Sequence, residues 1–288
     1  MPSEKLLRQI RSQKELVDSK LETTQVDNLI LKYPSGLLEQ IGSQFIDSII
    51  AAYHQACLNF YFYLTNEKSS LSLPAQIILL PNTNDPLFKD LYHSPTRYSR
   101  LPPWVKGYVN THIPAYIFSC DRNLIEVKAV GHELTHLFQV AIIKLTIENS
   151  SQVYAEPLWS PLISEGMAVG ANQRRPIEWL QLRINNTFPT LETISKEGIF
   201  SFDESKPESN ICYQYCVHLA EKLGQAIKKK EKNIIIQNSN FPPFFFILKL
   251  FQESLNRRIS FSHILLSEYQ IDFVQLETEL RASLGLPP

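Results

Sequence analysis

Apolar side chains recur at steps of three and four residues over much of this chain, and that spacing is the strongest constraint on its fold. It predicts helices over residues 3–32 and 37–64, the second of them long and amphipathic. Two short β-prone runs follow at residues 76–80 and 113–120. We therefore expect a largely helical chain with a smaller β component.

The composition excludes several classes of protein. Lys and Arg number 28 against 29 Asp and Glu, so no net field draws the chain to nucleic acid or to an acidic membrane surface. The apolar runs are far shorter than the roughly 20 residues that span a bilayer, which predicts no membrane insertion. Only 9 glycines occur, and no glycine-rich phosphate-binding motif is present. The polar N-terminus and four scattered cysteines favour a cytoplasmic protein.

One motif points to a specific chemistry. Residues 132–136 read H-E-L-T-H on a helix that is predicted to begin after Asn123. Side chains four residues apart project from the same face of a helix, so His132 and His136 can bind one ion. Glu133 then lies beside that ion, where a carboxylate can take a proton from a metal-bound water. We predict two metal-ligating histidines and Glu133 as the catalytic base.

Two histidines do not complete a catalytic zinc site, which needs a third protein ligand and an open position for water. Glu165 lies downstream, in the predicted first turns of an apolar helical segment. Two neutral histidines and one carboxylate leave bound Zn²⁺ with a net positive charge, so it stays a good Lewis acid. The sequence therefore predicts one zinc ion held by His132, His136 and Glu165.

These motifs resemble those of the gluzincin metallopeptidases, in particular the peptidase MA-like proteins, in which H-E-x-x-H is followed by a helix with E-G-x-A, here residues 165–168. The resemblance covers roughly residues 73–224. It implies a zincin-like α+β fold, with a small mixed sheet packed on the H-E-x-x-H helix and then a mainly helical subdomain. Residues 1–66 would form an N-terminal helical scaffold, residues 67–150 the sheet and motif helix, and residues 151–288 the subdomain with the third ligand.

The segment before the H-E-x-x-H motif also resembles the corresponding segment of family members. Family members place a Trp and a Gly before an edge strand that pairs with the substrate backbone, and Trp104 and Gly107 precede residues 116–120 here. Pro114 fits an edge position because proline cannot donate a ladder hydrogen bond. The resemblance thus implies a peptide or protein substrate that adds to this strand in an extended form.

Two departures from the family pattern change the prediction. Val169 stands where many gluzincins have an acidic residue that orients a zinc-binding histidine, so that partner is unassigned. Residues 107–111 do not match the motif with which related aminopeptidases hold a free amine. An endopeptidase is therefore favoured over an aminopeptidase.

A donor that stabilises the oxyanion of amide hydrolysis is expected on residues 211–224. Tyr213, Tyr215 and His218 are the candidates there, and Tyr154 is a further one. Tyr213 is our choice as the second catalytic residue. The alternative is that Tyr213 belongs to an apolar packing stripe of its helix.

The sequence thus predicts a zinc-dependent metallo-endopeptidase that works by Glu-assisted attack of a zinc-bound water. One alternative is a catalytically silent binding protein with a zincin fold. Another is a protease of narrow specificity, either a peptide-processing enzyme or a bacterial effector exported by a non-classical route. No residue pattern indicates a particular substrate or an oligomeric state.

Overall fold

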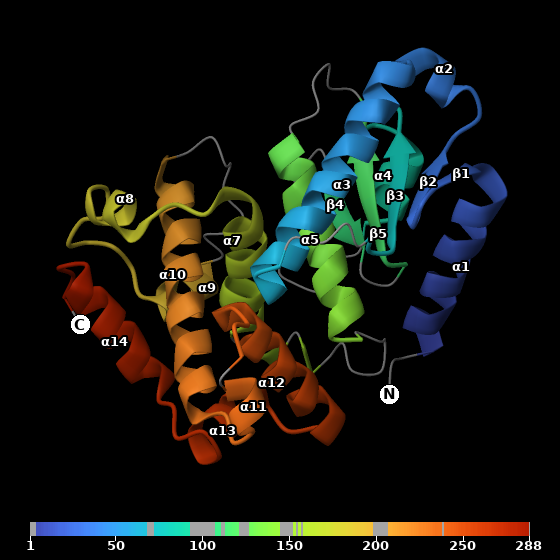
Figure 1. The fold of residues 1–288 in the computed structure, drawn as a ribbon. Helices are drawn as coiled ribbons and strands as arrows, with labels where there is room; N and C mark the ends of the chain where they lie inside the picture. The colour runs from blue at the N-terminus through green and yellow to red at the C-terminus, as the bar shows by residue number, and fades with distance from the viewer. Residues whose placement is uncertain are drawn as a thin grey trace. The chain divides into compact units, whose positions relative to one another are not determined.

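The computed structural model describes residues 4–67, 72–92, 107–110, 113–120, 127–144, 152–153, 155–156, 158–197, 207–237 and 239–287. The chain forms two compact units, Met1–Asn59 with Ser69–Ser151 and Phe60–Lys68 with Gln152–Pro288. Helices predominate, and the described strands form a small mixed sheet (Figure 1). The coarse α+β prediction is confirmed.

The first unit contains the sheet and the motif helix. Its elements are α1 (Glu4–Lys20), β1 (Glu22–Val26), β2 (Leu29–Tyr33), α2 (Leu37–Ile41), most of α3 (Ser43–Thr65), β3 (Ala75–Leu80), α4 (Pro86–Asp90), β4 (Gly107–Asn110), β5 (Ala115–Ser119) and α5 (Val127–Ile142). The strand order is β1-β2-β3-β5-β4. β2, β3 and β5 run parallel, whereas β1 and β4 are antiparallel to their neighbours.

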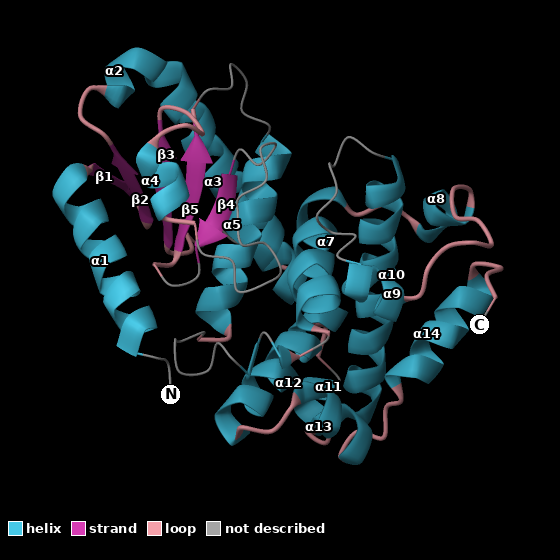
Figure 2. Ribbon diagram, turned by 180° about the vertical axis from the view of Figure 1, so that it is seen from behind, coloured by secondary structure: helices cyan, strands magenta, loops and turns pink. Residues whose placement is uncertain are grey.

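Helices cover both faces of this sheet (Figures 1 and 2). On one face, Ile78 of β3 and Ile117 of β5 share a buried cluster with residues of α1 and α4. Tyr108 adds a hydrogen bond there, from its hydroxyl to the Phe88 carbonyl at 2.5 Å. The other face meets α3 and α5, with the rings of Phe45 and Phe118 6.2 Å apart. β5 is buried on both faces, which explains its continuous apolar sequence.

The prediction of one helix over residues 3–32 is wrong beyond Lys20. β1 and β2 form a hairpin there, with Asp27 in the left-handed region at φ 53°. The residues of β2 alternate between buried and half-buried positions, a period of two that the helical interpretation overlooked. The helix predicted over residues 37–64 is divided into α2 and α3 at Gly42, where φ is 76°.

The prediction that residues 113–120 form an edge strand is also wrong. β5 lies between β3 and β4, and its residues Tyr116 to Ser119 pair with β3. Among the described residues, the strand at this edge of the sheet is β4, which begins at Gly107 and is four residues long. Pro114 is tolerated because it precedes the first paired residue, Ala115, and so removes no ladder hydrogen bond. Trp104 lies outside the described residues.

The second unit is helical. It contains the end of α3, the π-helix η1 (Trp159–Gly166), α7 (Met167–Gln173), α8 (Ile177–Gln181), α9 (Leu191–Glu197), α10 (Pro207–Lys230), α11 (Ile234–Gln237), α12 (Pro243–Arg257), α13 (Phe261–Ser267) and α14 (Phe273–Ser283). α10 is central and packs against η1, α7, α12 and α14. α13 and α14 are separate helices, and Asp272 caps α14 by accepting from the Val274 amide at 2.9 Å.

Gly170 in α7 makes a close contact that predicts a large effect of a small substitution. A methyl group there would overlap the Tyr63 hydroxyl, and the Tyr63 ring already lies 4.4 Å from that of Phe244. We expect Gly170→Ala to lower the free energy of unfolding by about 1–3 kcal/mol, measured by urea denaturation. The loss should shrink only in part in a Tyr63→Phe background, since the hydroxyl is gone but the ring carbon Cζ, 2.4 Å from the added methyl group, remains. Equal losses in both backgrounds would contradict this explanation.

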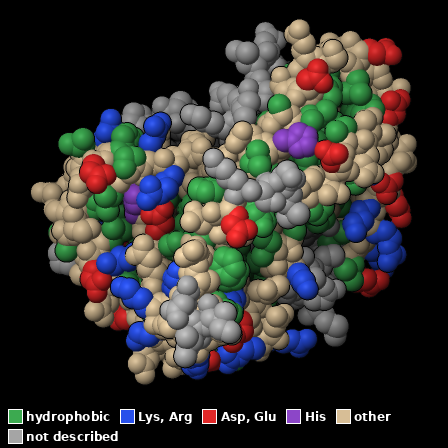
Figure 3. All heavy atoms as spheres, in the orientation of Figure 1, with side chains coloured by type: hydrophobic (Ala, Val, Ile, Leu, Met, Phe, Trp, Pro, Cys, Tyr) green, Lys and Arg blue, Asp and Glu red, His purple; other side chains and the backbone are tan. Residues whose placement is uncertain are grey.

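Acidic and basic side chains are interspersed on the face shown in Figure 3, in keeping with the balanced composition. Among the described residues, no helix is both long enough and apolar enough to cross a membrane.

Candidate metal centre

The H-E-x-x-H motif lies on α5, as the periodicity predicted. Val130, Leu134, Leu137 and Phe138 are buried along this helix, which packs against β3, β4 and β5. The predicted N-cap at Asn123 lies outside the described residues. Because α5 is anchored on the sheet through its apolar face, its two histidines occupy well-defined positions one helical turn apart.

The two histidines direct the same ring atom toward each other. The Nε2 atoms of His132 and His136 are 3.1 Å apart, and the rings are nearly perpendicular, at 84°. Two nitrogens bound to one tetrahedral zinc ion at 2.0–2.1 Å would lie about 3.3 Å apart. His132 is buried, with 6% exposure, whereas His136 is half-buried. The spacing of the two Nε2 atoms therefore fits a shared cation with little rearrangement.

Glu165 occupies a type of helix that the sequence did not predict. It is the penultimate residue of η1, not part of the first turns of an α-helix. The wider winding is marked by the Ile163 amide, which donates to the Leu158 carbonyl five residues earlier at 3.2 Å. Such π-helical turns are rare and occur frequently at functional sites. The α-helix α7 begins only at Met167.

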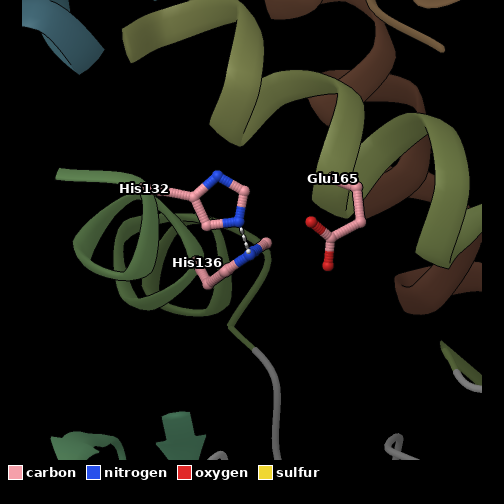
Figure 4. Close-up of side chains that lie close together, drawn as sticks. All are labelled: His132, His136 and Glu165. Carbon is pink, nitrogen blue, oxygen red and sulfur yellow. Dashed lines mark hydrogen bonds between the residues drawn. The ribbon is translucent and has the colours of Figure 1, made fainter. Parts of the chain in front are cut away.

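The three predicted ligands form a group that can hold a metal ion. One ligand atom from each of His132, His136 and Glu165 lies within 4.8 Å of the others (Figure 4). Two imidazole nitrogens and one carboxylate oxygen are a donor set that Zn²⁺ accepts, with a fourth position left for water. Glu133 is half-buried and follows the first histidine directly along α5. Its catalytic role stays a prediction.

The predicted oxyanion donors have different surroundings. Tyr213 is buried in an apolar cluster with Val169 and Val217, which agrees with the packing alternative without testing its catalytic role. The Tyr215 hydroxyl donates to Glu277 Oε1 at 2.9 Å. Burial, and then the negative charge of Glu277, raises the pKa of Tyr215. Tyr154 lies outside the described residues.

His218 belongs to a separate polar cluster on α10. Its Nδ1 lies 3.4 Å from Glu221 Oε2, and Arg174 donates to the same carboxylate from Nε at 2.5 Å. Burial on its own would raise the pKa of Glu221, but the hydrogen bonds from His218 and Arg174 outweigh burial and lower that pKa. The imidazole of His218 is thus held by Glu221 as part of the packing of α10.

Gln139 is a residue that the sequence reasoning missed. It is fully buried on α5, and its Oε1 lies 3.3 Å from Nδ1 of His136. The available signal was positional, since Gln139 comes three residues after His136 and therefore projects from the same helix face as the two histidines.

Comparisons with protein-family models, with curated proteins and with solved structures gave no match to this chain.

Proposed function

We propose that this protein is a zinc-dependent hydrolase with a zincin-like fold, and specifically a metallo-endopeptidase. His132, His136 and Glu165 would hold one zinc ion, and Glu133 would act as the general base. The observation that supports this proposal best is the convergence of one ring nitrogen from each histidine and one Glu165 carboxylate oxygen within 4.8 Å, with a further carboxylate one residue from His132.

Bound zinc would act as a Lewis acid, which polarises a carbonyl and lowers the pKa of a coordinated water to about 7. The Glu133 carboxylate accepts the proton of the attacking water and later passes it to the leaving amine. Because Glu133 is separate from the three ligands, it can change its protonation state without removing a bond to the ion. We therefore expect hydrolysis to need all four side chains.

The sheet offers one place for an extended substrate. β4 is an edge strand in the part of the chain that the structure describes, and it packs against α5, the helix with both histidines. A peptide that adds to the outer edge of β4 would gain main-chain hydrogen bonds, while side-chain contacts would give specificity. We propose β4 for this role in place of residues 116–120, because Tyr116, Ile117 and Phe118 are paired on both sides.

A catalytically silent metal-binding protein is the second candidate. The apolar cluster around Tyr213 favours it, since the predicted oxyanion donor packs against Val169 and Val217. Turnover distinguishes the two candidates, because the silent protein would bind zinc without cleaving peptides. A quenched-fluorescent library of random peptides, incubated with the zinc-loaded protein, provides that measurement.

The purified protein is expected to carry about one zinc ion per chain, because three protein ligands suffice for a catalytic site. Elemental analysis after purification without chelators measures this directly. His132→Ala should lose the ion, whereas His263→Ala is a matched control, since His263 is exposed on α13. A wild-type protein that takes up no zinc even after incubation with excess Zn²⁺ would contradict the proposal.

A further inference from the structure

Gln139 is placed where a partner of the metal-ligating His136 is needed. The Gln139 side chain is fully buried, on the turn of α5 that follows the motif. Burying an amide without hydrogen bonds is unfavourable by roughly 1–3 kcal/mol. A glutamine at this position is therefore expected to make specific polar contacts, and the contact with Nδ1 of His136, at 3.3 Å, is one of them.

The chemistry of that contact determines which ring nitrogen carries the proton. An amide oxygen only accepts hydrogen bonds, so Gln139 Oε1 selects the imidazole form in which Nδ1 is protonated. In neutral imidazole the lone pair is then on Nε2. Nε2 is the atom that lies 3.1 Å from Nε2 of His132. The hydrogen bond on one side of the ring thus prepares the other side for a cation.

The side chain at position 169 cannot orient a metal-binding histidine, so the contact between Gln139 and His136 matters more. Val169 packs in an apolar cluster with Tyr213 and Val217, and so offers no acceptor to an imidazole. We propose that Gln139 is the positioning residue of the metal centre. Its side chain holds His136 in the Nδ1-protonated form and fixes the orientation of the ring. This role rests on the metal site proposed above. Gln139 touches the ligand and not the ion, and acts through His136.

Partners of this kind typically contribute 10–100-fold to metal affinity. Gln139→Met keeps the volume of the side chain but removes the acceptor, so zinc affinity should fall by about that factor. Gln139→Glu retains an oxygen that accepts from Nδ1 and should restore most of the affinity. Gln214→Met is the matched control, because Gln214 is also a buried amide but bonds to the Gln173 carbonyl and the Arg175 amide. Competition with a chromophoric chelator measures the zinc affinity of the wild type and of the three variants.

A second measurement does not depend on bound metal. Long-range ¹H–¹⁵N NMR of the metal-free wild type should show His136 protonated at Nδ1, and Gln139→Met should shift it toward a mixture of tautomers. A metal-free wild type with the proton on Nε2 would overturn the assignment. The assignment would also be overturned if Gln139→Met bound zinc as tightly as the wild type while Glu165→Ala lost zinc. That pattern would contradict the role of Gln139 but would still support the proposed metal centre. Wild-type protein that binds no zinc would overturn both.

Discussion

Glu133→Gln is expected to retain about one zinc ion per chain, while peptide hydrolysis falls by about 10²–10⁴-fold. The amide has nearly the same shape as the carboxylate, but it cannot accept a proton from the attacking water. Because Glu133 is not one of the three grouped ligands, the metal content should not change. Elemental analysis and the rate of cleavage in the peptide library measure the two effects separately.

Glu178→Gln is a suitable control for that variant, since Glu178 is exposed on α8 in the second unit. It should match the wild type in both metal content and rate. Equal turnover by Glu133→Gln and the wild type would show that another group is the base. Loss of zinc in Glu133→Gln would instead identify Glu133 as a ligand.

Glu165→Ala is expected to weaken zinc binding by more than the 10–100-fold effect of losing a supporting hydrogen bond, because a direct ligand is removed. Only His132 and His136 would remain, and two ligands form an incomplete site. Turnover should be lost together with the metal. Chelator competition measures the affinity, and Glu178→Ala is the matched control.

Circular dichroism of both glutamate variants checks that the helices are intact, so that a loss of zinc can be attributed to the missing carboxylate. Glu165 is half-buried near the end of η1, and alanine is well tolerated in helices. Unchanged zinc affinity in Glu165→Ala would move the third ligand elsewhere in the chain.

The parts of the fold that depend on local spacing were predictable from the sequence. α5 has a clear apolar face, and an H-E-x-x-H motif on any helix brings its two histidines to one side. β3 was predicted because residues 76–80 are a compact β-prone run between turn-forming residues. In each case the pattern that predicts the element is formed by residues close together in the sequence.

The errors share a physical cause, which is strand pairing and helix packing that the local spacing of apolar residues does not reveal. β4 has only four residues and no strong strand pattern, so its partnership with β5 could not be inferred, and β5 was taken for the edge. The β1–β2 hairpin was hidden because its apolar residues also fit helical steps. The π-helical winding around Glu165 occurs in a helix that packs against α10, and local propensity does not describe such packing.

The site residues divide in the same way. His132, His136 and Glu165 could be named from motif spacing and ligand chemistry, and the structure groups them. Gln139 was missed because the role of a buried amide depends on which group it hydrogen-bonds to. Here that group is Nδ1 of His136, and the contact depends on side-chain rotamers that the sequence does not give.

The last turns of α3 carry a practical consequence for anyone who wishes to produce the helical unit by itself. Residues Phe60–Lys68 belong to that unit although the 83 residues Ser69–Ser151 separate them from the remainder. A recombinant fragment starting at Gln152 would lack Tyr63, whose phenol ring contacts Gly170 and Phe244. Such a fragment would expose apolar surface and tend to aggregate. Supplying residues 60–68 as a synthetic peptide, or fusing them through a flexible linker, should restore its solubility.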